Sequence, residues 1–253
     1  MSPFETAINT HKDRDQDTFR DVSSLDKLLH FEPDTSQGHV KAAISLIEKG
    51  QEILGEGKLA LVSSFGAESA VLLHLVSRVD KNFPVFFLDT GKHFKETLDY
   101  VDLLSARLRL TNVQFVSPNV KEVESLDPNG DLHKSDPDTC CAIRKVAPLA
   151  ETLKSFNGWI TGRKRFHGGG RATLPLAELD EGKIKLNPIV DWSPEQIEEH
   201  FTNFGLPSHA LTAQGYTSIG CEVCTNKPTP GSDTRSGRWQ GKSKFECGIH
   251  KAA

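Results

Sequence analysis

Five cysteines carry the clearest chemical signal in this chain of 253 residues. They form an adjacent pair, a C-x-x-C and a singleton, namely Cys140, Cys141, Cys221, Cys224 and Cys247. An odd number of thiols argues against a framework of disulfide bonds. Four cysteines plus one therefore predict a metal or cluster site and a separate reactive thiol.

The first four cysteines favour an iron–sulfur cluster. A structural zinc site normally uses two spaced pairs, because adjacent cysteines do not comfortably span one edge of a tetrahedron. Thiolates are the usual ligands of a [4Fe–4S] cluster, and Lys145 follows the adjacent pair by one helical turn, where its charge would face an anionic cluster. A zinc ion and inert thiols are the alternatives.

The fifth cysteine lies in the polar, glycine-flanked stretch "FECGIH" (245–250). Nearby cations stabilise a thiolate, lower the pKa of the thiol and attract an anionic substrate. Glu246 opposes both effects, so a nucleophile and an incidental surface thiol are both compatible with this stretch. Four cations precede Cys247, namely Arg235, Arg238, Lys242 and Lys244.

Two loops have the composition of anion-binding sites. "SSFGAES" (63–69) follows an apolar run and precedes a helical one, so backbone N–H groups and a helix dipole could face an anion, although it is neither a Walker A loop nor G-x-G-x-x-G. "TGRKRFHGGGR" (161–171) is either a solvated basic loop or an arginine clamp, and its position after a predicted strand favours the clamp. A lone loop histidine such as His167 is more often incidental than catalytic.

Alternating elements position these loops. Apolar runs predict strands over 59–65, 83–91, 113–116 and 158–162, and helical spacing predicts helices over 39–55, 68–79, 93–108 and 140–156. This order indicates an α/β fold with a doubly wound, mostly parallel sheet, which binds ligands at the carboxyl ends of its strands. A hairpin around 180–182 and a helix capped by Ser193 follow, and the chain is irregular after about 206.

Changes in composition along the chain indicate the domain boundaries. We expect a polar, poorly ordered or loosely docked arm over 1–36, a nucleotide-binding domain over 37–230 and a tail over 231–253. With 37% hydrophobic residues, 25% charged residues and no signal peptide or membrane span, the protein is expected to be cytoplasmic, where thiols stay reduced. A net charge of −4 gives no general affinity for nucleic acid.

Taken together, the motifs over residues 58 to 250 resemble the phosphoadenylyl-sulfate/adenylyl-sulfate reductases, which have an adenine-nucleotide α-hydrolase-like fold. The motifs are "SSFGAES", "FLDTGKHFKETL", "CCAIRKVAPL", "ITGRKRF", "GYTSIGCEVCT" and "GRWQGKSKFECGIH". The four paired cysteines resemble those of the assimilatory bacterial branch, which carries one [4Fe–4S] cluster per subunit and typically reduces adenylyl sulfate (APS). The 3′-phosphorylated substrate, PAPS, is the alternative.

The resemblance implies a two-stage reaction. The thiolate of Cys247 attacks the sulfur of APS, AMP leaves, and reduced thioredoxin or glutaredoxin then releases sulfite from the S-sulfocysteine. The cluster would have an electrostatic and structural role. An RNA-thiolating enzyme of the same fold should show S-G-G-x-D-S, which this chain lacks, and a zinc-stabilised nucleotide-binding module is the non-catalytic alternative. The oligomeric state stays open.

The resemblance also assigns substrate-binding residues. Ser63, Ser64, Gly66 and Ser69 would hold the phosphate and sulfate end, and Leu88, Asp89, Thr90 and Gly91 would lie near the adenosine. Trp239 is expected to contribute packing rather than chemistry. Val223, His167 and Phe245 depart from the usual pattern without removing a ligand or the nucleophile. The arginine loop and the phosphosulfate contacts would be supplied by Lys145, Arg163, Arg171, Arg235 and Arg238, and His250 matches the family's terminal histidine.

Overall fold

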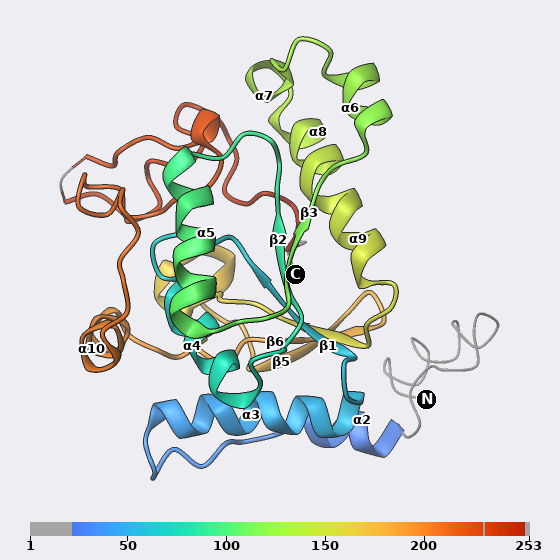
Figure 1. The fold of residues 1–253 in the computed structure, drawn as a ribbon, viewed down its shortest axis with the longest axis vertical. Coiled ribbons are helices and arrows are strands. Elements are labelled where there is room, and N and C mark those ends of the chain that lie inside the picture. Colours follow the sequence, from blue (N-terminus) through green and yellow to red (C-terminus); the bar gives the residue numbers. More distant parts are fainter. Residues whose placement is uncertain (1–21, 230, 251–253) are drawn as a thin grey trace.

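The computed structural model describes residues 22–229 and 231–250. At its centre is a six-stranded sheet in the order β3-β2-β1-β4-β6-β5, in which all neighbouring strands are parallel except the edge pair β5 and β6 (Figure 1). The predicted α/β fold with a mostly parallel sheet is confirmed. The strands are β1 Leu59–Ser63, β2 Val85–Leu88, β3 Val113–Val116, β4 Gly158–Ile160, β5 Ala177–Asp180 and β6 Lys183–Leu186.

Helices cover both faces of the sheet (Figure 1). The larger core lies between the sheet and α3, α4 and α5, and a smaller cluster on the other face joins Leu149 and Leu153 of α9 to Trp159 and Leu88. All four residues of β2 are buried, as expected of a strand covered on both faces. The helices are α2 Val22–Leu29, α3 His39–Leu54, α4 Ser69–Val79, α5 Lys95–Leu108, α6 Val120–Leu126, α7 Leu132–Ser135, α8 Pro137–Cys141, α9 Ala147–Leu153 and α10 Pro194–Phe204.

The chain reverses its winding direction between β1 and β4. From β1 it moves outward through α4 to β2 and through α5 to β3, and it then returns over the opposite face through α8 and α9 to β4. Two neighbouring strands whose following loops diverge in this way leave a crevice at their carboxyl ends. The loops after β1 and β4 are the two that the sequence singled out as anion-binding.

The prediction of a poorly ordered or loosely docked arm over 1–36 is wrong for the part that forms α2. This helix docks on the main core through Leu25 and Leu28, which are 2% and 0% exposed. The charged residues around it masked a short apolar stripe in the sequence. The rest of that prediction, over 1–21, lies outside the described residues.

The helix predicted over 140–156 is interrupted. The adjacent cysteines end α8, a π-helical turn follows over Ala142–Val146, and α9 then begins with Pro148 in its first turn. The wider turn accommodates a proline that could not donate an ordinary helical hydrogen bond. The capping box of α10, with Ser193 and Gln196, is confirmed.

After α10 the described chain has little regular structure, as predicted. It contains a short 3₁₀ turn over Glu222–Cys224 and an isolated bridge between Thr225 and Arg238, and a second bridge, between His93 and Cys221, ties it to the domain. Among the residues that the structure describes, every helix is too short or too polar to cross a membrane.

Candidate functional site

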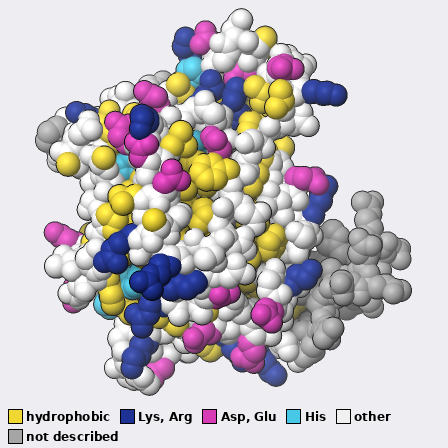
Figure 2. Space-filling view, in the orientation of Figure 1, with side chains coloured by type: hydrophobic (Ala, Val, Ile, Leu, Met, Phe, Trp, Pro, Cys, Tyr) yellow, Lys and Arg dark blue, Asp and Glu magenta, His cyan; other side chains and the backbone are white. Residues whose placement is uncertain are grey.

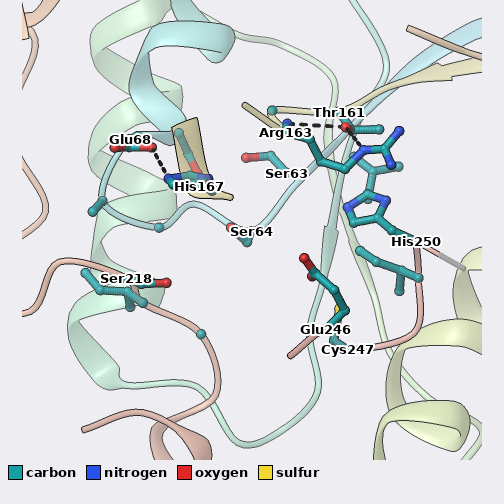
Figure 3. A pocket seen from close by; sticks show the side chains of 18 of the residues that line it. Ser63, Ser64, Glu68, Thr161, Arg163, His167, Ser218, Glu246, Cys247 and His250 are labelled. Carbon is teal, nitrogen blue, oxygen red and sulfur yellow. Dashed lines mark hydrogen bonds and ion pairs between the residues drawn. The ribbon is translucent and has the colours of Figure 1, made fainter. Parts of the chain in front are cut away.

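One pocket at the carboxyl ends of β1 and β4 brings together most of the predicted site residues (Figure 3). The β1–α4 loop supplies one side of it, the loop after β4 supplies another, and the C-terminal segment closes over both. The predicted residues in its lining are Ser63, Ser64, Gly66, Ser69, Leu88, Lys145, Arg163, Arg171, Arg235, Arg238, Cys247 and His250.

Three predicted substrate residues, Asp89, Thr90 and Gly91, are absent from the lining of this pocket. They form a turn behind it, in which Asp89 accepts a hydrogen bond from the Gly91 N–H at 2.9 Å. Thr90 is fully buried, and its hydroxyl lies 3.3 Å from the Sγ of Cys221. The structure therefore places Thr90 beside a predicted cluster ligand rather than in the pocket.

The β1–α4 loop is held from below by an aromatic contact. Phe65 has a positive φ of 45° and is fully buried against Phe87, with ring centroids 5.7 Å apart. The Ser63 hydroxyl accepts a hydrogen bond from the Phe65 N–H. A Cβ on Gly66 would lie 3.1 Å from the carbonyl oxygen of Ile219, so glycine permits a close approach of the later chain.

The arginine loop after β4 divides its cations between two directions. Arg163 is 6% exposed, donates to the hydroxyl of Thr161 and the amide oxygen of Asn187, and pairs with Glu178. Arg165 turns outside the pocket to pair with Asp191. The loop is therefore fixed by its own ion pairs rather than uniformly solvated, and its role as an anion clamp stays a prediction.

Ion pairs bring the C-terminal segment into the pocket. The guanidinium of Arg171 donates to both carboxylate oxygens of Glu246, at 2.6 and 2.9 Å, and Arg235 donates to the carbonyl oxygen of Phe245 at 2.9 Å. Burial alone would raise the pKa of Glu246, but Arg171 outweighs it and holds that pKa below its ordinary value. This pairing places the next residue, Cys247, inside the pocket (Figure 3).

His250 anchors the end of that segment. Its ring stacks on Trp159 of β4, with centroids 5.5 Å apart and an interplanar angle of 6°. Burial lowers the pKa of His250 well below its ordinary value, so the ring is neutral near pH 7. His250 thus lies at the site, as predicted, and its aromatic contact joins the end of the segment to the sheet.

Two of the four cations predicted to surround Cys247 line the pocket, namely Arg235 and Arg238. Lys242 and Lys244 instead turn toward α7 and α8, where Lys242 donates to main-chain carbonyls and Lys244 pairs with Asp138.

Lys145 supplies charge from the π-helical turn. Burial alone would lower its pKa, but the thiols of Cys221 and Cys247 outweigh this and raise the pKa above its ordinary value. The ammonium is therefore charged, and it lies between the nucleophile candidate and the group of paired cysteines.

Several buried nitrogens in the pocket lining have no protein partner. Such atoms are costly unless water or a ligand satisfies them, so they point to a polar ligand. Within the described residues these pocket atoms are His93 Nδ1, Arg238 Nε, Trp239 Nε1 and His250 Nδ1. Trp239 was expected to contribute packing, and its ring is indeed 5% exposed with the Arg238 guanidinium 4.5 Å from its centroid.

The four paired cysteines lie behind the pocket. Cys140, Cys141 and Cys221 are buried, and Cys224 is half-buried. Burial raises the pKa of Cys140, and the thiols of Cys221 and Cys224 add to this, so these sulfurs share one neighbourhood. Among the described residues, no three His, Cys, Asp or Glu side chains are arranged around a single metal ion.

The sequence analysis missed an acidic residue of the site and undervalued a histidine. Glu68, inside the "SSFGAES" loop, pairs with the Nζ of Lys164 at 2.5 Å and lies 3.5 Å from the Nε2 of His167 (Figure 3). His167, treated as incidental, also lies 3.2 Å from an Arg171 nitrogen through its Nδ1. The signal for Glu68 was its place in a predicted anion-binding loop, where a carboxylate is unexpected.

The comparisons with known proteins agree with this geometry. Residues 58–227 match the family described as "Phosphoadenosine phosphosulfate reductase domain". The chain is 46% identical over 217 residues to a protein of Mesorhizobium japonicum named adenosine 5′-phosphosulfate reductase, with 86% of this chain and 85% of the relative covered. A relative of the same name from Rhodococcus erythropolis is 38% identical, with 91% and 90% covered.

Two solved structures are similar in fold. A phosphoadenylyl-sulfate (PAPS) reductase from Candida auris, in complex with phosphate, aligns with a TM-score of 0.59 and 27% identity, covering 71% of this chain and 88% of that one. An FMN adenylyltransferase from Candida glabrata aligns with a TM-score of 0.54 and 15% identity, covering 83% and 73%, which shows a shared fold alone. On the family match and the extent of these identities, the chain belongs to the phosphoadenosine phosphosulfate reductase family.

Proposed function

We propose that this chain reduces APS to sulfite and AMP in sulfate assimilation, with Cys247 as the nucleophile. The observation that carries the proposal is the position of Cys247 in a pocket lined by Lys145, Arg235 and Arg238. Two relatives that are 46% identical over 217 and 221 aligned residues are named adenosine 5′-phosphosulfate reductase. A cysteine surrounded by cations at the carboxyl ends of a nucleotide-binding sheet suits attack on a nucleotide-bound sulfate group.

In the first step the Cys247 thiolate forms a bond to the sulfur of APS, and the bond from that sulfur to the bridging oxygen breaks. The products are AMP, which takes the electron pair of the broken bond, and an S-sulfocysteine on Cys247. The cations of the pocket attract the anionic nucleotide and offset the charge that develops on the leaving phosphate.

In the second step a dithiol protein, thioredoxin or glutaredoxin, attacks the Cys247 sulfur. Sulfite leaves, a mixed disulfide forms, and the second thiol of the partner resolves it to regenerate Cys247. The dithiol supplies both electrons, which convert the sulfur from the oxidation state of sulfate to that of sulfite. The adduct must reach the partner, which requires the C-terminal segment to leave the pocket.

We further propose that Cys140, Cys141, Cys221 and Cys224 hold one [4Fe–4S] cluster per subunit. Thiolates are the usual ligands of such clusters, and the thiols of Cys221 and Cys224 lie close enough to Cys140 to raise its pKa. When bound, the cluster supplies electrostatic and structural support. Lys145 lies between these cysteines and Cys247 and would couple the charge of the two sites.

Mass spectrometry of the intact protein after mixing with APS alone tests the nucleophile. We expect one sulfonate-sized adduct that maps to Cys247, and its release as sulfite when reduced thioredoxin is added. The Cys247→Ser variant should bind AMP but form no adduct. An adduct on another cysteine, or turnover without any adduct, would contradict the proposal.

The second candidate is the reduction of PAPS, which the resemblance to the Candida auris enzyme supports. The same adduct assay with APS and PAPS at equal concentrations separates the two. We expect faster adduct formation with APS, and a strong preference for PAPS would reverse the assignment.

A further inference from the structure

The cations of the pocket are offset only in part by carboxylates that line it. Six cations line it, and two carboxylates, Glu68 and Glu246, lie among them. Glu246 belongs to the C-terminal segment, whereas Glu68 directly precedes α4 and is part of the domain itself. Glu68 is therefore a negative charge that stays in the pocket whether or not the segment is docked. The six cations are Lys145, Arg163, Lys164, Arg171, Arg235 and Arg238.

Glu68 engages two groups that could otherwise bind an anion. One of its carboxylate oxygens, Oε2, lies 2.5 Å from the Nζ of Lys164 and 3.5 Å from the Nε2 of His167. The side chain of Lys164 is 4% exposed and that of Glu68 is 28% exposed, so the pair faces the pocket rather than open solvent. In Figure 3 the Glu68 carboxylate points toward the imidazole of His167.

The carboxylate is ionised under all conditions in which the enzyme would work. Burial alone would raise the pKa of Glu68, but the hydrogen bond from His167 and the charge of Lys164 outweigh it and lower that pKa to about 2. At neutral pH, Glu68 thus neutralises Lys164. Of the six pocket cations, Lys145 and Arg238 are the two without a carboxylate partner among the described residues.

We infer that Glu68 is a specificity-determining residue, which favours nucleotides with one anionic end and disfavours those with a second phosphate. A 3′-phosphate adds roughly −1.5 to −2 charges at pH 7. The reacting sulfate must lie at Cys247, so here the phosphosulfate takes the unpaired Lys145 and Arg238 rather than the β1–α4 loop, and a 3′-phosphate would face Glu68. Among the described residues at that end, Lys164 is already paired with Glu68 and Arg171 with Glu246, and the Glu68 carboxylate itself repels the phosphate. The inference rests on the proposed function, because it concerns the choice between APS and PAPS.

The probes are AMP and adenosine 3′,5′-bisphosphate, which differ only in the 3′-phosphate. Their dissociation constants are measured by titration calorimetry on the protein as purified with its native metal content, in wild type and in Glu68→Gln. In the variant, we expect the affinity for the bisphosphate relative to AMP to rise about ten-fold, because one repulsive charge is lost and Lys164 becomes available. Added salt should reduce this gain.

Two further variants serve as a control for the loss of a carboxylate outside the pocket and as a second test at Glu68. Asp191→Asn removes a carboxylate that pairs with Arg165 of the same loop but does not line the pocket, and it should leave the affinity ratio unchanged. Glu68→Ala leaves room for water beside the buried Lys164 ammonium, so it serves if the glutamine variant is unstable, and it should shift the ratio in the same direction.

The outcomes distinguish the inference from the proposed function. An unchanged ratio in a folded Glu68 variant, or an equal shift in Asp191→Asn, would overturn the role of Glu68. If wild type binds neither nucleotide, the proposed function fails instead. A wild-type preference for the bisphosphate would contradict both the choice of APS and the exclusion by Glu68.

Discussion

The two sides of the pocket are built in different ways. The sheet side consists of the loops after β1 and β4, which are fixed to the main core by buried groups such as Phe65 and Arg163. The tail side, residues 235–250, has no helix or strand, and apart from the buried Trp239 and the bridge of Arg238 it is held by part-buried ion pairs and one aromatic stack. Buried apolar packing is lost only when the whole fold opens, whereas ion pairs that water still reaches are weakened by salt. The tail side can therefore open while the sheet side stays folded, as a nucleophile that serves a nucleotide and then a protein partner requires.

Substitutions at two glycines, one on each side, should have the largest effects. In Gly158→Ala, the new Cβ would lie 2.7 Å from the Ile184 carbonyl oxygen and 2.6 Å from a methyl group of Leu54, inside the sheet. We expect the free energy of unfolding to fall by about 3 kcal/mol, measured by urea denaturation. Gly170→Ala, whose Cβ would meet nothing within 4 Å, is the control and should unfold like wild type.

The corresponding glycine of the tail side is Gly237. Its Cβ would lie 2.0 Å from the Asn226 carbonyl oxygen, beside the bridge between Thr225 and Arg238. We expect Gly237→Ala to lose adduct formation at Cys247 while the urea midpoint of the sheet stays within error of wild type. A large loss of global stability in this variant would show that the tail folds together with the sheet.

Acid should weaken the sheet side through a buried histidine pair between α4 and α10. The Nδ1 of His74 lies 2.9 Å from the Nε2 of His200, and burial lowers the pKa of each to about 4. Because the unfolded rings titrate near 6.5, the unfolded state binds more protons below that pH, and stability is lost as the pH falls from 6.5 toward 4. Each ring lowers the free energy of unfolding by about 2 kcal/mol between pH 7.5 and 5, so the pair together lowers it by about 4 kcal/mol. In His200→Phe the pH dependence in urea denaturation should shrink, and an unchanged slope would exclude this pair as its source.

The sheet side was largely predictable from sequence, because its signals are local. The strand runs, the capping box at Ser193 and the polar loops after β1 and β4 each lie within a few neighbouring residues. The helix α2 escaped prediction because its stripe is only one turn long among charges. The shortened strands around 59–63 and 85–88 reflect the usual uncertainty at element ends.

The tail side was predictable in composition but not in its contacts. Its cations and Cys247 stand out in the sequence, yet nothing local indicates that Glu246 pairs with Arg171, or that Lys242 and Lys244 turn away. These contacts join residues far apart in the chain, and only the fold decides them. The same holds for Thr90, whose place beside Cys221 depends on the packing of the turn after β2.

Removal of the Glu246 charge should open the tail side without substrate. In Glu246→Gln we expect Cys247 to react with iodoacetamide about ten-fold faster, since the variant loses a bidentate, charge-assisted contact with Arg171. The rate is measured at the same alkaline pH for both proteins. Wild type should approach the variant at high salt. The control is Glu151→Gln, which breaks an exposed ion pair with Lys154 and should leave the rate unchanged. An unchanged rate in Glu246→Gln would show that the Arg171–Glu246 pair does not hold the tail.

The aromatic stack should have the smallest effect. Stacked rings contribute about 0.5–1.5 kcal/mol beyond their buried area, so His250→Ala should raise the same alkylation rate by about five-fold. His250→Phe keeps a ring on Trp159 and should restore the wild-type rate, and salt should not alter either result because the His250 ring is neutral. If His250→Ala raises the alkylation rate more than Glu246→Gln does, the main attachment of the C-terminal segment is to the sheet rather than to the arginine loop. The ionic contacts would then mainly place Cys247. The part of the tail that opens would begin at Cys247 rather than at residue 235.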